Sequence, residues 1–122
     1  MLHRTLLHEL PSVAAHSERV AARVAPRFAE VALLHDVLED TDLTAEQLEP
    51  LVGAETTASV VVLTRLESET YAEYILRVAN SGDEAAVAVK LADLEDHLAL
   101  TATLPESLER RYRKAEKVLR NL

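Results

Sequence analysis

The chain contains no cysteine and no tryptophan, and only 3% of its 122 residues are aromatic. Without cysteine it has neither disulfides nor thiolate ligands for a metal ion, and it suits a reducing compartment. Two glycines and four prolines interrupt a sequence that is 48% apolar. A chain with so few aromatic residues and helix breakers packs through alanine, valine and leucine. The composition therefore predicts an all-α protein, and the length predicts a single domain over residues 1–122.

Long apolar runs are missing as well. No stretch approaches the roughly 20 apolar residues that span a membrane, and the start, MLHRTLLHEL, lacks the apolar core of a signal peptide. We therefore expect a soluble, cytoplasmic protein with no membrane partner. The formal net charge of −8 repels polyanions, which argues against a general nucleic-acid-binding protein. Assembly into a homo-oligomer stays open.

Basic residues are concentrated at the C-terminus. Six of the thirteen lysines and arginines fall in the last segment, namely Arg110, Arg111, Arg113, Lys114, Lys117 and Arg120. Cations are favourable at a helix C-terminus because of the helix dipole, so a solvated helix end is one interpretation. A local anion-binding clamp is the other.

Apolar residues recur at helical spacing between the prolines, and we expect about seven helices among eight candidate segments. A short one precedes Pro11; the others fall at about 12–25, 27–40, 45–52 and 54–65, from Ser68 or Glu69 onwards, through 84–100, and at 105–121. Thr44 and Gln47 have the spacing of a capping box, which predicts a helix start after Thr44.

The segment VALLHDVLEDT, residues 31–41, places charged side chains inside an apolar helix. At 100° per residue, one face about 140° wide carries four of them: His35, Asp36, Glu39 and Asp40. Two unit charges about 4 Å apart repel by roughly 4 kcal/mol at an effective dielectric constant near 20. A divalent cation beside this face would offset the repulsion and would explain the adjacent histidine.

Two further polar residues interrupt apolar faces. His16 lies in VAAHSERVAARVA and Asp93 lies in VAVKLADLEDHLAL. Taken singly, such residues are more often hydrogen-bonded core groups or solvated groups than metal ligands. Together with His35 and Asp36 they form a set of two histidines and two aspartates. Its nitrogen and oxygen donors suit Mn²⁺, Fe²⁺, Co²⁺ or Zn²⁺, with positions left for water and substrate.

Five segments, in order over residues 16–120, carry a family resemblance: HSERVA, ALLHDVLEDTD, LTRLESETYAEYILRVA, VKLADLEDHL and RYRKAEKVL. They resemble the HD-domain metal-dependent phosphohydrolases, and most closely the RelA/SpoT-type branch and its small stand-alone relatives. That branch removes the 3′-diphosphate of (p)ppGpp. The resemblance implies an HD-domain helical bundle with metal ligands His16, His35, Asp36 and Asp93, and Mn²⁺ as the usual ion.

The resemblance also implies that Glu39 and Asp40 orient and deprotonate the attacking water, and that Tyr112 lies near the substrate. Arg19 and Lys90 lie one helical turn from His16 and Asp93, respectively. At these places they would direct positive charge at a substrate phosphate, or they are surface residues.

The chain departs from the family pattern at two places. His97 replaces an asparagine that usually helps to bind substrate, and LPSVAAHS shortens a basic segment that usually helps to hold the guanine nucleotide. Three hypotheses stay open: hydrolysis of a phosphorylated nucleotide such as (p)ppGpp at its 3′-diphosphate; hydrolysis of another nucleotide or small phosphate ester; or a non-catalytic metal-binding module.

Overall fold

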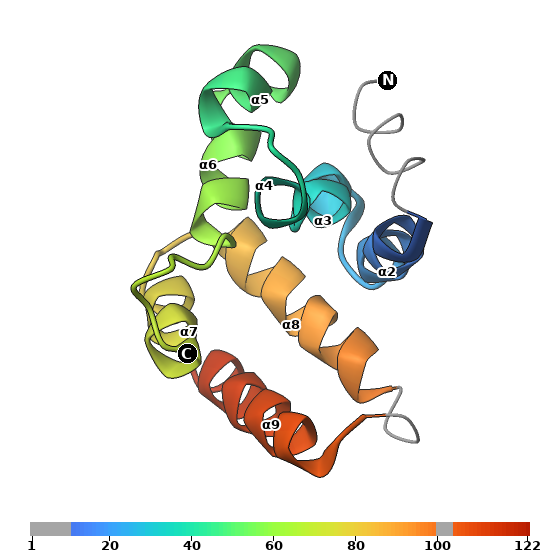
Figure 1. Ribbon diagram of the computed structural model, residues 1–122, viewed down its shortest axis with the longest axis vertical. Coiled ribbons are helices and arrows are strands. Elements are labelled where there is room, and N and C mark those ends of the chain that lie inside the picture. The colour runs from blue at the N-terminus through green and yellow to red at the C-terminus, as the bar shows by residue number, and fades with distance from the viewer. Residues whose placement is uncertain (1–10, 100–103) are drawn as a thin grey trace.

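The computed structural model describes residues 11–99 and 104–122 (Figure 1). Every regular element in this part is helical, so the prediction of an all-α bundle is confirmed; the helix expected before Pro11 lies outside the described residues. The elements are α2 (Pro11–Ala22), η1 (Pro26–Phe28), α3 (Ala29–Leu34), α4 (Val37–Asp40), α5 (Ala45–Val52), α6 (Ala54–Val62), α7 (Tyr71–Ala79), α8 (Glu84–Leu98) and α9 (Glu106–Arg120). None of these helices is both long and apolar enough to cross a membrane.

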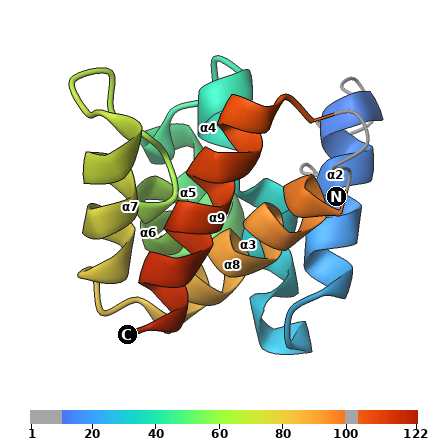
Figure 2. The same cartoon turned by 90° about the horizontal axis from the view of Figure 1, so that it is seen from below.

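Helix α8 occupies the centre of the bundle (Figures 1 and 2). One of its sides packs in a core cluster with α2, α3 and α6, to which it contributes Ala86, Val89 and Ala92. Leu94 belongs to a second cluster, shared with α7 and α9. Because α8 is covered on two sides, the polar side chains on those sides lie in the interior. This places Lys90, Asp93 and Asp96 among its buried residues.

Capping boxes set the starts of two helices. The one predicted at Thr44 is confirmed, since the Thr44 side chain accepts from the Gln47 backbone N–H and the Gln47 side chain accepts in return. Thr70 and Glu73 make the same reciprocal pair. Helix α7 therefore begins at Tyr71, later than the expected start at Ser68 or Glu69, because the cap fixes Thr70 in extended backbone.

The prediction of one helix over 27–40 is wrong, because the helix is interrupted between Leu34, where α3 ends, and Val37, where α4 begins. The break has a local cause. The ring of His35 bonds the backbone carbonyl of Ala32 at 2.6 Å, and the His35 N–H bonds the same carbonyl at 3.4 Å. A side chain that takes a carbonyl of its own helix competes with the regular ladder of backbone bonds. Asp36 then becomes the N-cap of α4, and the shared helix face assumed from the sequence is interrupted.

The segment between α6 and α7 is held by two side chains of α7. The Tyr74 hydroxyl donates to the Leu63 carbonyl at 2.6 Å. The Arg77 guanidinium donates to the carbonyls of Val62 and Thr64 at 3.0 and 2.9 Å, and it pairs with Glu69 at 2.7 Å. These bonds fix the course of the segment, which brings the backbone N–H of Arg65 to α4.

Candidate metal centre

The structure brings the four predicted metal ligands together. His16 comes from α2, His35 and Asp36 from the junction of α3 and α4, and Asp93 from α8. One potential ligand atom from each residue lies within 4.8 Å of those of the others. His35 and Asp93 are buried, whereas His16 and Asp36 are half-buried. Segments distant in the sequence thus converge on one small volume, although the break at His35 was not expected.

The ring of His16 is held between two carboxylates of α8. Its Nδ1 lies 2.6 Å from Asp96 Oδ2, and its Nε2 lies 2.6 Å from Asp93 Oδ1. Asp96 is itself clamped by Arg19, whose Nε and Nη2 donate to its two oxygens at 2.8 and 3.0 Å. Arg19 and Asp96 therefore orient the imidazole, which turns Nε2 toward the other three residues. Such a carboxylate on the far nitrogen is usual for a metal-bound histidine.

The ring of His35 is oriented in a comparable way by a backbone group. Its Nδ1–H donates to the Ala32 carbonyl, because a carbonyl oxygen can only accept. In the neutral ring Nε2 then carries no proton, and its lone pair points outward. The Nε2 atom lies 3.2 Å from Asp36 Oδ2 and 3.3 Å from Asp93 Oδ1. A lone pair and two carboxylate oxygens repel one another unless a proton or a cation lies between them.

The donor set fits a divalent cation. Two imidazole nitrogens and two carboxylates, with both rings fixed from behind, are the ligands expected for Mn²⁺, Fe²⁺, Co²⁺ or Zn²⁺. A cation would meet the Nε2 lone pair of His35 and the oxygens of Asp36 and Asp93 simultaneously. The residues present therefore fit the group that the sequence predicts.

Charges at the site shift the pKa values of its groups strongly. Burial lowers the pKa of His35, but hydrogen bonds to Asp36 and Asp93 and their charges outweigh it and raise the pKa to about 10. Burial raises the pKa of Asp93, but the charge of Lys90 and hydrogen bonds to the surrounding histidines hold it well below its usual range. Lys90 Nζ donates to Asp93 Oδ2 at 2.7 Å, so this buried lysine balances one buried carboxylate.

Glu39 and Asp40, predicted to handle the proton of water, lie on α4 beside Asp36. Glu39 Oε1 accepts from the backbone N–H of Arg65 at 2.6 Å. Within the described residues its Oε2 has no hydrogen-bond donor. Burial and the charge of Asp36 raise the pKa of Glu39 against the opposing Arg65 N–H, and the same two causes raise the pKa of Asp40. Both shifts are in the direction that suits a general base working near neutral pH.

The predicted substrate-binding residues divide into two pairs. Arg19 and Lys90 are each engaged with a carboxylate of α8, as described above, and Lys90 is buried rather than at the surface. His97 and Tyr112 lie together beside the four central residues. Their rings stack with centroids 5.1 Å apart, and His97 Nε2 is 3.4 Å from Asp93 Oδ1.

Sequence reasoning missed Asp96, which joins Arg19 to His16. A signal was present: Asp96 follows Asp93 by three residues, so the two share one face of α8, and that face also carries buried apolar residues. A second acidic residue on a buried helix face requires a partner on another helix. Arg65 was missed as well, and its contribution through a backbone N–H leaves no trace in the sequence.

No protein-family model matches the chain. The chain is 38% identical over 95 residues to the probable guanosine-3′,5′-bis(diphosphate) 3′-pyrophosphohydrolase of Synechocystis sp.. The match covers 70% of this chain and 12% of that protein, so the chain spans a small part of its relative. The similarity supports a relationship to RelA/SpoT-type hydrolases.

Proposed function

We propose that the chain is a metal-dependent phosphohydrolase that acts on a phosphorylated nucleotide such as (p)ppGpp at its 3′-diphosphate. The observation that carries the proposal is the convergence of His16, His35, Asp36 and Asp93 within 4.8 Å, with both imidazoles oriented from behind. The name of the Synechocystis relative supports the reaction and the nucleotide.

The four residues would hold one divalent ion, for which the family resemblance favours Mn²⁺. When bound, such an ion supplies Lewis-acid polarisation of a phosphate oxygen and lowers the pKa of a nearby water. The chain contributes the orientation of the ligands through the Arg19–Asp96–His16 contacts, and Lys90 offsets the charge of Asp93.

Glu39 is the general base in this mechanism. Its Oε1 is held by the Arg65 N–H, which leaves Oε2 to accept the proton of the attacking water. Asp40 lies next to Glu39 on α4. The two carboxylates share the role of proton acceptor, because a proton on either one lowers its repulsion from the charge of Asp36. His97 and Tyr112 present a ring surface beside the ligands, against which the sugar or base of a nucleotide packs.

A second candidate function is hydrolysis of another nucleotide or of a small phosphate ester. It is favoured by His97, because an imidazole already stacked on Tyr112 occupies the place where the family carries an asparagine for the substrate. A non-catalytic metal-binding module is the remaining hypothesis, and the same experiment separates all three.

The test is a hydrolysis screen with added Mn²⁺, using ppGpp, nucleoside mono-, di- and triphosphates, and p-nitrophenyl phosphate. We expect ppGpp to give GDP and pyrophosphate in equal amounts. Glu49→Gln, an exposed carboxylate on α5, should match the wild-type rate, whereas Glu39→Gln should not. Turnover of a different ester alone selects the second function. A protein inert to every ester with Mn²⁺ bound is the non-catalytic module.

A further inference from the structure

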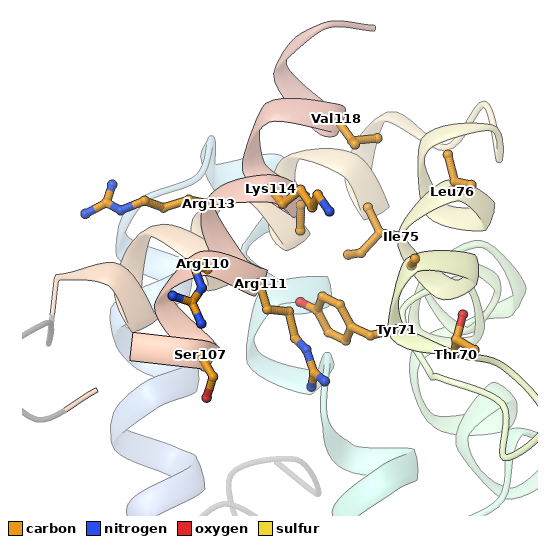
Figure 3. Close-up of a pocket in the computed structure, with 12 residues that line it drawn as sticks. Thr70, Tyr71, Ile75, Leu76, Ser107, Arg110, Arg111, Arg113, Lys114 and Val118 are labelled. Atoms are coloured by element: carbon orange, nitrogen blue, oxygen red, sulfur yellow. The ribbon is translucent and has the colours of Figure 1, made fainter. Parts of the chain in front are cut away.

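A pocket of ≈ 920 Å³ lies between α7 and α9 (Figure 3). The ring of its wall residue Tyr71 lies 6.1 Å from the ring of Tyr112, centroid to centroid. None of the four predicted metal ligands lines the pocket. Its wall combines an apolar surface with basic side chains. The apolar surface is formed by Tyr71, Ile75, Leu76 and Val118, and the basic side chains are Arg110, Arg111, Arg113 and Lys114. Among the residues that the structure describes, no aspartate or glutamate lines the pocket. Its size suits a small organic molecule, since ligand pockets are commonly about 300–1,000 Å³.

The positive charge of this α7/α9 pocket is only partly neutralised by the protein. Arg110 pairs with Glu106 at 3.1 Å and Arg113 pairs with Glu109 at 3.0 Å, one turn earlier on α9. Within residues 11–99 and 104–122, Arg111 and Lys114 form no ion pair. Two unpaired cations gathered at one pocket, in a chain of net charge −8, favour an anionic occupant at this place.

The apolar part of the wall indicates the rest of the ligand. The Arg111 guanidinium lies 5.1 Å from the centroid of the Tyr71 ring, so a planar cation and an aromatic ring meet on the wall between the helices (Figure 3). Leu76 adds an apolar side chain that is 52% exposed. Simple phosphate would leave these apolar surfaces unused, whereas a base or other ring attached to a phosphate would cover them.

We propose that the α7/α9 pocket, which is lined by none of the four predicted metal ligands, is a second binding site for a phosphorylated nucleoside. Its phosphates pair with Arg111 and Lys114, and its base packs on Tyr71, Ile75 and Leu76. The concave shape, and a described lining that contains no acidic residue, favour a small anion over an extended partner. The overall negative charge of the chain opposes an anionic membrane or a nucleic acid.

The site can be tested with ATP that carries a fluorescent methylanthraniloyl group on the ribose, titrated in the presence of a chelator. We expect saturable binding, competition by unlabelled ATP, and weaker competition by inorganic triphosphate. The double variant Arg111→Ala, Lys114→Ala should weaken binding about tenfold or more, because it removes two charge-assisted contacts. The matched control Lys117→Ala, Arg120→Ala removes the same charge from α9 outside the pocket and should have little effect.

A second pair of variants tests the apolar wall. Leu76→Asp places a negative charge in the pocket, whereas Leu51→Asp places one on α5, at a leucine of nearly equal exposure, 51% against 52%. Only Leu76→Asp should weaken binding. All these side chains are exposed, so circular dichroism should show unchanged helix content in each variant.

Asp36→Ala separates this pocket from the metal centre, and it should bind the probe like wild type. The proposal is overturned by the absence of saturable binding, by equal losses in the two double variants, or by loss of binding in Asp36→Ala. Equal losses would mean diffuse charge attraction along α9. Loss in Asp36→Ala would place the probe at the metal centre. None of these outcomes depends on whether the protein hydrolyses a substrate.

Discussion

Replacing Asp96 with asparagine should weaken metal binding although Asp96 is not one of the predicted ligands. In the structure its Oδ2 accepts from His16 Nδ1 at 2.6 Å, and Arg19 donates to both of its oxygens at 2.8 and 3.0 Å. Asparagine has the same size but keeps only one oxygen, and its amide N–H groups would face the donors of Arg19 or His16. The imidazole would lose its orientation. It would also lose the carboxylate that makes Nε2 more basic and therefore a stronger metal ligand.

Loss of such a partner typically costs about 10- to 100-fold in metal affinity, which is about 1.4 to 2.7 kcal/mol. Isothermal titration of metal-free protein with Mn²⁺ measures it directly. Glu95→Gln is the matched control, because Glu95 is the neighbouring carboxylate on α8 and pairs with Arg120 on the surface. It removes the same charge without touching a predicted ligand.

The reasoning is refuted if Asp96→Asn and Glu95→Gln both bind Mn²⁺ as tightly as the wild-type protein does. Equal weakening would also refute it, because the effect would then follow from net charge alone. Arg19→Ala gives an independent check. It should weaken Mn²⁺ binding less than Asp96→Asn does, since the Asp96 carboxylate remains in contact with His16.

Further changes follow from the same structure. Glu39→Gln should retain Mn²⁺ and helix content while lowering turnover about 10²-fold or more, and adding Asp40→Asn should cost little more, in steady-state assays. Chelation should lower the thermal midpoint in calorimetry, because a bound ion stabilises the folded state. Arg77→Lys should lower the free energy of unfolding by about 1–2 kcal/mol in urea titrations, since lysine cannot serve two carbonyls and a carboxylate. The Arg77 contact and the Leu66 N–H lower the pKa of Glu69 from 4.5 to about 2, so its stabilisation is complete above pH 4.5 and is lost as the pH falls toward 2. The stability difference between wild type and Glu69→Gln should therefore shrink over that range.

The assembly of the helices into a bundle was implied by the family resemblance, whereas helical periodicity and capping residues were sufficient to predict most of the helices, because both act over a few residues. The Thr44–Gln47 box was placed correctly for this reason. The break at His35 was not predicted, because it depends on a side chain that takes a carbonyl of its own helix. Periodicity describes the average helix and carries no information about such a bond.

The clustering of His16, His35, Asp36 and Asp93 was predicted because each is polar in an apolar helix and needs a partner. Their role as metal ligands stays a prediction. The contacts around them were harder to foresee, because they depend on how two helices face each other. Arg19 was predicted either to direct charge at a phosphate or to be a surface residue, and its contact with Asp96 was not foreseen. The basic C-terminal segment left two interpretations open, and only the placement of α7 beside α9 shows that Arg111 and Lys114 line a pocket.

Equilibrium dialysis with Mn²⁺ tests the metal centre most directly. Wild-type protein should bind one ion per chain, and so should Asp42→Ala, which removes an exposed carboxylate close to the site in sequence. Asp36→Ala should bind much more weakly, because it removes one of the four converging ligands. Retention of the ion by Asp36→Ala with wild-type affinity, or the absence of a bound ion in the wild-type protein, would contradict the assignment of these residues as a metal site.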